Sequence, residues 1–178
     1  MAKLFDPLNI NGMQLNNRFV RSATMDHFAK DGMVTETEIN LYRELAKGEV
    51  GLIISHGLCP SPDGWVSTGQ LCIDRDETIP SLAKLTKAVH EYDGKVAAQI
   101  MHGGWFSNPT VTGCQVVGPS AMVNPANGYE ARELSGDEIL ARIEDHIQAG
   151  RRAVEAGFDA VQLHCAHGNC RILQLMRA

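Results

Sequence analysis

The sequence predicts an α/β protein built around a parallel β-sheet. Short runs of apolar, often β-branched residues alternate along the chain with longer stretches of helical periodicity. No internal repeat, low-complexity stretch or linker interrupts the 178 residues, so we expect a single domain over 1–178. A doubly wound sheet and a (β/α) barrel both fit this order of elements, and polar residues at the strand ends favour the barrel.

A β-hairpin and a first strand are expected at the N-terminus. Residues 8–15 alternate apolar and polar side chains around Asn11-Gly12, a dipeptide that favours a two-residue hairpin turn. Residues 18–22 then form a first strand. Three further strands are expected at 51–55, 95–101 and 159–164, and their mainly apolar composition suits a sheet that is covered on both faces.

Helical stretches separate these strands. Thr35 and Ser135 each stand three residues before a glutamate, which fits a capping box, and Thr78 with Pro80 opens the helix between them. The last helix is expected to bury an apolar stripe formed by Ile139, Ile143, Ile147 and Val154. His90 in the middle helix and His146 in the last helix are expected to lie on the surface.

A long connection over 102–134 precedes the last helix. It is rich in glycine, proline and asparagine, and loops of this length inside a compact domain are usually functional. The glycines of His102-Gly103-Gly104-Trp105 indicate close backbone approach at its start.

Composition excludes some classes of function. The formal net charge of -5 is not that of a nucleic-acid-binding surface. No apolar run reaches the roughly 20 residues that span a bilayer, and no apolar signal segment follows Met1. We therefore expect a cytoplasmic protein whose five cysteines are free thiols.

Polar residues occupy the predicted C-terminal ends of the strands. Ser22, Ser55, Gln99 and His164 each stand at such an end. In a (β/α) barrel these ends face the active site. The other interpretation is that polar residues simply mark where strands stop.

The pair His164-x-x-His167 is the most distinctive candidate site. Two imidazoles could hold a carbonyl or phenolate oxygen and stabilise negative charge that develops on it. A metal site with Cys165 and Cys170, or a hydrogen-bonded structural pair, are the alternatives, but no C-x-x-C or H-E-x-x-H spacing supports a metal and we expect none.

Two further positions could contact a ligand. The side-chain amide of Gln99 offers two donors and an acceptor, which suits the edge of a heterocycle or the capping of a loop. Residues 22–25 include small side chains that would let a ligand approach the backbone, or that form a tight turn.

Short motifs follow one another in a characteristic order along the chain to Gly168. They are Leu4-Phe5-Asp6-Pro7-Leu8, Leu15-Asn16-Asn17-Arg18, Gly51-Leu52-Ile53-Ile54, Gln99-Ile100-Met101-His102-Gly103-Gly104, Gly118-Pro119-Ser120-Ala121, Arg132-Glu133-Leu134-Ser135, and Ala156-Gly157-Phe158-Asp159 before His164-x-x-His167-Gly168. Together they resemble the old yellow enzyme family, of the NADH:flavin oxidoreductase/NADH oxidase type.

The resemblance implies the N-terminal half of a (β/α)8 TIM barrel, with about four parallel strands and an N-terminal β-hairpin. Members of the family bind FMN, take hydride from NAD(P)H and pass it to an activated alkene or enone. By position, the cofactor-binding residues would be Ala23, Thr24, Met25, Gly57 by the flavin ring, and Gln99 at its pyrimidine edge. His164 and His167 would be the catalytic residues that bind the substrate's oxygen.

The chain also departs from the family pattern. Asn169 stands where the family has a proton-donating tyrosine, and residues 169–178 follow the pattern only loosely. A (β/α)8 barrel needs about 250 residues. The resemblance implies that the second half of the barrel supplies the phosphate-binding loops and a basic residue near the flavin. We expect a truncated enzyme that is inactive alone, a homodimer of two halves, or a non-catalytic half-barrel that serves as an assembly partner or is a fragment.

Overall fold

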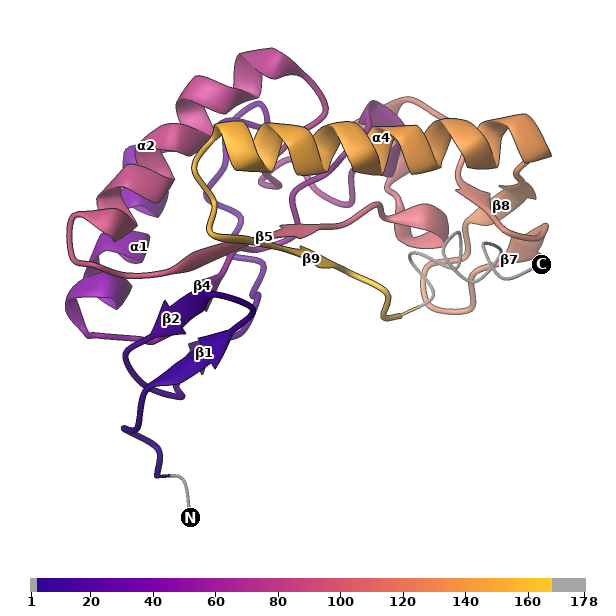
Figure 1. The fold of residues 1–178 in the computed structure, drawn as a ribbon. Helices are drawn as coiled ribbons and strands as arrows, with labels where there is room; N and C mark the ends of the chain where they lie inside the picture. Colours follow the sequence, from indigo (N-terminus) through magenta and orange to yellow (C-terminus); the bar gives the residue numbers. More distant parts are fainter. Residues whose placement is uncertain (1–2, 168–178) are drawn as a thin grey trace.

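The computed structural model describes residues 3–167, which are arranged around a four-stranded parallel sheet (Figure 1). Its strands are β3 (Val20–Arg21), β4 (Leu52–Ile54), β5 (Val96–Ile100) and β9 (Ala160–Leu163), in the order β3-β4-β5-β9. All three pairings are parallel. The four parallel strands expected from the sequence are therefore confirmed, and their C-terminal ends meet along one edge of the sheet.

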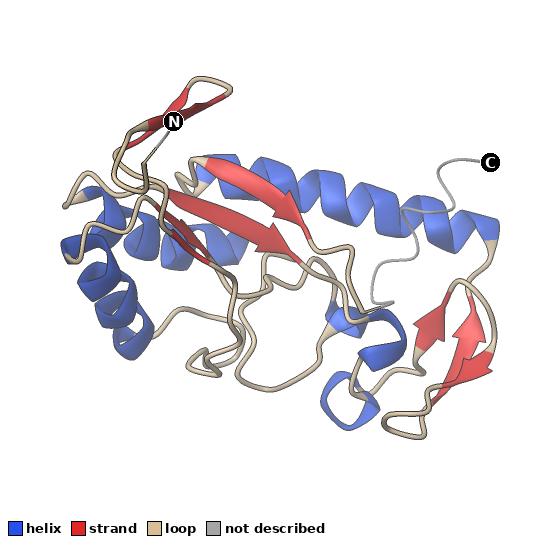
Figure 2. Ribbon diagram, turned by 90° about the horizontal axis from the view of Figure 1, so that it is seen from below, coloured by secondary structure: helices blue, strands red, loops and turns tan. Residues whose placement is uncertain are grey.

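Three long helices cover one face of this sheet, as Figure 2 shows from below. They are α1 (Glu36–Lys47), α2 (Ile79–His90) and α4 (Gly136–Glu155). The main core lies between helices and sheet and includes Leu85, Val89, Val96, Ala98 and Ile100, all at most 1% exposed. Alternation along β5 therefore sends Val96, Ala98 and Ile100 to the helices, and Ala97 and Gln99 to the opposite face.

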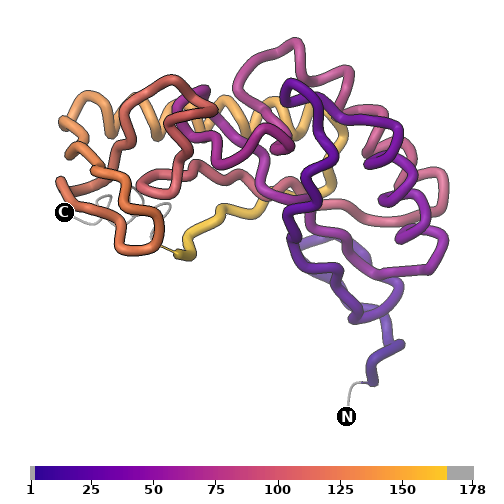
Figure 3. Tube along the Cα trace, turned by 180° about the vertical axis from the view of Figure 1, so that it is seen from behind, coloured from indigo at the N-terminus to yellow at the C-terminus, as the bar shows by residue number. Residues whose placement is uncertain are grey.

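The N-terminal hairpin packs on that opposite face. Strands β1 (Leu8–Ile10) and β2 (Met13–Leu15) pair antiparallel, and Asn11 and Gly12 form the turn with φ values of 47° and 93°. Leu15 packs with Leu52 and Ala97. In Figure 3 the hairpin lies at one end of the molecule, far from the segment that joins β5 to α4. The predicted hairpin is confirmed, and it leaves the other end of the strands free for a site.

The long connection after β5 contains more regular structure than its composition predicts. It holds η3 (Gly104–Phe106), α3 (Pro109–Thr112) and a small sheet of β6 (Val117–Gly118), β7 (Met122–Val123) and β8 (Glu130–Glu133), in the order β6-β8-β7. Two 3-10 turns, η1 (Pro62–Gly64) and η2 (Asp76–Thr78), lie in the connection between β4 and α2. The connection after β5 is thus an ordered subdomain beside the strand ends.

The two predicted capping boxes have different outcomes. At α4 the box is complete: the Ser135 hydroxyl accepts from the Glu138 N–H, and the Glu138 carboxylate accepts from the Ser135 N–H. At α1 the Thr35 hydroxyl accepts from the Glu38 N–H at 3.5 Å, but the Glu38 carboxylate is turned into the interior, 2.9 Å from His56. The second half of the predicted α1 box is therefore wrong, because Glu38 has a buried partner instead.

The predicted apolar stripe of α4 is right in its first half, because Ile139 and Ile143 pack against Val117 and Leu134, and wrong in its second half. Ile147 and Val154 are 57% and 71% exposed, whereas Ala149 and Ala153 are fully buried. Small side chains let the helix backbone approach α2 and β5, with which α4 is in contact. His146 belongs to the same buried face, with its Nδ1 2.7 Å from the Arg142 carbonyl oxygen. The prediction that His146 is a surface residue was therefore wrong.

His90 does lie at the surface, with a side chain that is 39% exposed and 2.9 Å from the Asp159 carboxylate. No helix within residues 3–167 is long and apolar enough to cross a membrane.

The alanine face of α4 generates a stability prediction. Replacing Ala149 with leucine adds volume where none is free, so we expect Ala149→Leu to lower the free energy of unfolding by about 1–3 kcal/mol. The control Ile147→Ala changes an exposed position and should stay within about 0.5 kcal/mol. Urea denaturation followed by circular dichroism measures both. If Ile147→Ala were the more damaging change, Ile147, and not Ala149, would lie on the buried face of α4.

Candidate functional site

Four loops meet at the C-terminal edge of the parallel sheet. Backbone hydrogen bonds join three of them: the Leu58 N–H donates to the Gln99 carbonyl (2.7 Å), the Met101 N–H to Leu58 (2.9 Å) and the His164 N–H to Ile100 (3.0 Å). The segments after β4, β5 and β9 are therefore held side by side. The segment after β3 joins them through a contact between Met25 and His56.

Gln99 presents its amide on the face of the sheet that the helices do not cover. Its backbone N–H donates to the Ser55 hydroxyl (3.0 Å), and its Nε2 donates to the Gln162 Oε1 (2.6 Å). Gln162 pairs with Gln99 in the β5–β9 register. A primary amide has two donors and one carbonyl acceptor, so this bond uses only part of the side chain's capacity. The amides of Gln99 and Gln162 lie side by side on this face, which we call the inner face, and could together bind the polar edge of a heterocycle.

The segment after β3 takes its shape from side-chain contacts. Arg21 donates to the Ser22 carbonyl and, at 2.6 Å, to the Thr24 hydroxyl. The Met25 sulfur lies 3.3 Å from Nδ1 of His56, the residue that follows β4 by two positions. These contacts place residues 23–25 next to the loop after β4.

Gly57 lies where no side chain fits. A Cβ there would approach the Met101 Cβ to 2.8 Å and the Met101 sulfur to 2.9 Å. Its carbonyl accepts from the Gln70 amide at 3.0 Å, and Gln70 is fully buried. The glycine therefore lets the loops after β4 and β5 pack in direct contact.

The predicted histidine pair does come together. The rings of His164 and His167 have centroids 5.5 Å apart and planes inclined by 31°. The backbone turns at His167, with φ of 60°, and the Trp105 indole N–H donates to the His167 carbonyl at 3.1 Å. Partial burial lowers the pKa of His164, and the neighbouring charge of His167 lowers it further. A neutral His164 offers one donor and one acceptor. Gly168, Asn169 and Cys170 lie outside the described residues.

An open cavity of about 330 Å³ lies beside this pair. Val66, Met101, Phe106 and His167 line it, so its walls are mainly apolar. A larger cavity of about 390 Å³ lies at the opposite end of the sheet and includes Asn17, Gly51 and Lys95. In barrel enzymes the chemistry occurs at the C-terminal ends of the strands, so the smaller cavity is the candidate site.

A partly buried ionic cluster supports the loops on this side. His102 is fully buried, 3.4 Å from the Asp63 carboxylate, and Arg142 of α4 contacts the same carboxylate at 2.5 Å. Burial would raise the pKa of Asp63, but hydrogen bonds from His102 and Ser61 and the charge of Arg142 outweigh it and lower that pKa well below its usual range. The cluster ties η1 and the start of the connection after β5 to α4. The sequence analysis did not identify Asp63 and Arg142, because the two residues are far apart in the sequence and no motif connects them.

The close backbone approach predicted at Gly103 is confirmed, because a Cβ there would lie 2.8 Å from the Gly64 carbonyl oxygen. The approaching group is protein backbone of η1.

A parallel (β/α) sheet with its polar groups gathered at the C-terminal strand ends is the arrangement found in barrel enzymes. Within that class, the sequence matches the NADH:flavin oxidoreductase / NADH oxidase family over residues 3–170. The chain belongs to that family.

Curated relatives include an NADPH dehydrogenase of Bacillus subtilis, 35% identical over 168 residues, which are 93% of this chain and 49% of the relative. A probable NADH-dependent flavin oxidoreductase of the same organism, YqiG, is 37% identical over 170 residues, which are 93% of this chain and 45% of the relative. The chain thus spans about half the length of these relatives.

Solved structures give the same relation. The old yellow enzyme homologue from Zymomonas mobilis superposes with a TM-score of 0.89 at 31% identity, covering 94% of this chain and 50% of that one. Morphinone reductase superposes with a TM-score of 0.86 at 28% identity, covering 93% and 48%. The fold is therefore the N-terminal half of a TIM barrel, as the sequence predicted.

The histidine pair generates a prediction on proton binding. We expect His164 to titrate below the ordinary value of 6.5, because burial disfavours its charged form. His167→Gln removes the smaller, electrostatic cause, so the pKa of His164 should rise but stay below that value. Since the folded pKa is the lower one, stability should fall as the pH drops below about 6.5. NMR titration of the imidazole C–H signals measures both proteins, and a His164 pKa at or above the ordinary value would contradict this assignment.

Proposed function

We propose that the chain forms the FMN- and substrate-binding half of an oxidoreductase that transfers hydride from NAD(P)H through FMN to an activated alkene. The observation that carries the proposal is the convergence of four strand ends in a chain whose family match covers residues 3–170. Flavin and nicotinamide use in general follows from the family. FMN in particular, the alkene substrate and the residue roles are our proposal.

The residues at the strand ends fit a flavin. The Gln99 amide lies on the inner face of the sheet, where it would bind the polar pyrimidine edge of the ring. Residues 23–25 would approach the ring through their backbone, and Gly57, against which Met101 packs, would lie beside the ring. When bound, FMN supplies the redox chemistry, and these side chains supply position and polarity.

His164 and His167 would bind the oxygen of the substrate's electron-withdrawing group. Two imidazoles with centroids 5.5 Å apart, beside a mainly apolar cavity, suit a carbonyl oxygen on an otherwise apolar molecule. A hydrogen bond that strengthens as charge develops on this oxygen lowers the barrier and does not merely improve binding. The carboxamide of Asn169 is no useful acid, so we propose that solvent protonates the α-carbon.

A flavin titration tests the proposal. Addition of FMN to the purified chain should perturb the visible spectrum of the cofactor. Gln99→Leu removes the amide and should weaken binding by about tenfold, which corresponds to about one hydrogen bond. The matched control Gln115→Leu changes an exposed glutamine on the connection after β5 and should bind FMN as the unmodified chain does. The dissociation constant is measured by absorbance and by flavin fluorescence.

Two results would count against the assignment. No spectral change at any FMN concentration would contradict flavin binding by this chain alone. If Gln99→Leu and Gln115→Leu weakened FMN binding equally, Gln99 would have no specific role in the site. The proposal that the chain binds a flavin would still stand.

A second candidate function, assembly with another barrel half, is favoured by one specific observation. Val161 and Leu163 on β9 are 43% and 44% exposed, and Leu140, Ile147 and Val154 on α4 are more exposed still. Exposed strand edges and contiguous apolar surfaces are sites of association. We propose that this surface joins a second set of strands, in a homodimer or in a larger protein, and that the protein works in the cytoplasm.

Sedimentation velocity tests the assembly proposal. We expect a compact dimer, and Val161→Lys with Leu163→Lys should convert it into a monomer because charges on an apolar contact are costly to bury. The control Leu4→Lys alters an exposed apolar residue near the N-terminus and should leave the dimer intact. A monomeric unmodified chain, or a heterogeneous aggregate that both variants share, would contradict this interface.

A further inference from the structure

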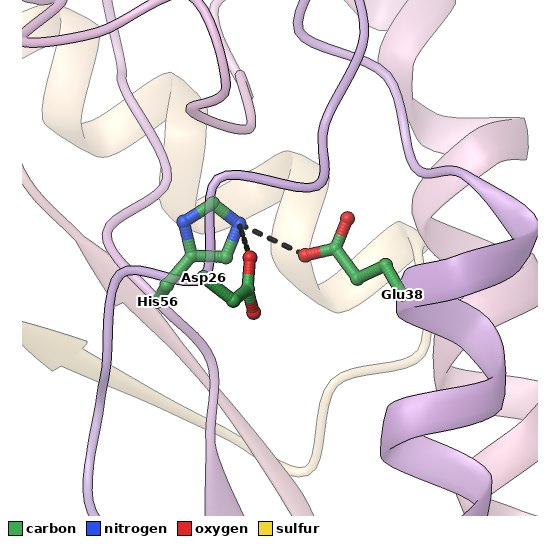
Figure 4. A group of neighbouring side chains, drawn as sticks. All are labelled: Asp26, Glu38 and His56. Carbon is green, nitrogen blue, oxygen red and sulfur yellow. Dashed lines mark ion pairs between the residues drawn. The ribbon is translucent and has the colours of Figure 1, made fainter.

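Three side chains from three separate elements meet beneath the strand ends (Figure 4). Asp26 comes from the segment after β3, Glu38 from the first turn of α1, and His56 from the loop after β4. The His56 Nε2 lies 2.9 Å from a Glu38 oxygen and 3.9 Å from an Asp26 oxygen. One ligand atom from each residue lies within 4.8 Å of the other two.

This group is buried and incompletely satisfied. The side chains of Glu38 and His56 are 0% exposed, and that of Asp26 is 7% exposed. Within residues 3–167, His56 Nε2, both Glu38 oxygens and the Asp26 Oδ2 have no hydrogen-bond partner, although Nε2 and Glu38 are close. Burying carboxylates without such partners is costly. Burial raises the pKa of Glu38, and His56 offsets this only in part while Asp26 adds to it.

The orientation of His56 aims Nε2 at the two carboxylates. Its Nδ1 faces the Met25 sulfur at 3.3 Å, and its backbone N–H donates to the Tyr42 hydroxyl at 3.2 Å. With the proton on Nδ1, the lone pair of Nε2 points toward negatively charged oxygens. A positive species must then lie between them, either a proton or a cation.

We infer that Asp26, Glu38 and His56 bind a divalent transition-metal ion, a site that is separate from the flavin chemistry proposed above. Bonds of about 2.0–2.1 Å to a tetrahedral zinc ion place its ligand atoms roughly 3.4 Å apart. The two separations from His56 Nε2, 2.9 Å to Glu38 and 3.9 Å to Asp26, lie on either side of that value. One imidazole with two carboxylates suits zinc, iron or manganese better than calcium, which prefers oxygen alone.

The ion would have a structural effect. It would join the segment after β3, helix α1 and the loop after β4. Without it, two acidic side chains, Asp26 and Glu38, are buried against one histidine. The contact between Met25 and Nδ1 would act as the outer interaction that orients the ligating ring. The Tyr42 hydroxyl, which contacts the His56 backbone, lies at the edge of the site, and water or this hydroxyl would complete the coordination.

Zinc titration of the purified chain, prepared without a histidine tag and stripped with chelator, tests the inference. We expect one zinc ion per chain by elemental analysis after gel filtration. At a zinc concentration about 100-fold above Kd, Tm should rise by about 5–10 °C. Glu38→Gln and Asp26→Asn keep the side-chain shapes but supply poor ligands, so each should weaken zinc binding by at least about tenfold.

Matched controls separate this site from other ligands in the chain. Glu36→Gln changes an exposed carboxylate in the same turn of α1 and should bind zinc as the unmodified chain does. His167→Ala should also retain the ion. Cobalt substitution should give a spectrum without a thiolate charge-transfer band, which excludes cysteine ligands.

Three results would overturn the inference. Absence of stoichiometric zinc would mean that a proton alone bridges His56 and Glu38. Undiminished zinc binding in both Glu38→Gln and Asp26→Asn would place the ion elsewhere. A thiolate band with cobalt would assign it to the cysteines. Because no flavin is added, failure here leaves the FMN proposal untouched.

Discussion

Parallel pairing of β3, β4, β5 and β9 determines where every candidate site residue lies. In a parallel sheet all strands end at the same edge, so residues far apart in sequence, such as Met25, Gln99 and His164, come to the same edge although no local sequence pattern links them. The hydrogen bonds that continue past the strands, from Leu58 to Gln99 and from His164 to Ile100, extend this order into the loops. The register also places Gln99 opposite Gln162, so two amides face the side that the helices leave open.

Much of this arrangement could be predicted from the sequence, because its signals are local. The Asn11-Gly12 turn, the Ser135 capping box and the apolar runs of the four strands each depend on neighbouring residues. The polar strand ends predicted the position of the site, and the collinear motifs predicted the family that the comparisons established. The roles of Ala23, Thr24, Met25, Gly57 and Gln99 toward a flavin remain proposals that this geometry supports.

What could not be predicted depends on tertiary contacts. Ile139 and Ile143 of α4 pack as the apolar stripe predicts, but toward α2 and β5 the buried side chains are Ala149 and Ala153, because small residues allow closer approach. Glu38 fits a capping box by spacing, yet His56 in the loop after β4 draws its carboxylate inward. The cluster of Asp26, Glu38 and His56 has no spacing that resembles a metal motif, since the three residues come from different elements. Burial and long-range pairing therefore decide the outcomes that local patterns leave open.

The most direct test of the account is to map the backbone amide shifts of the chain as FMN is added. We expect the changes to concentrate at residues 23–25, at Gly57 and at Gln99, on the C-terminal edge of the sheet. The larger cavity at the opposite edge, which includes Asn17, Gly51 and Lys95, should remain unaffected. Changes confined to that opposite cavity would contradict the claim that the parallel strand ends assemble the site.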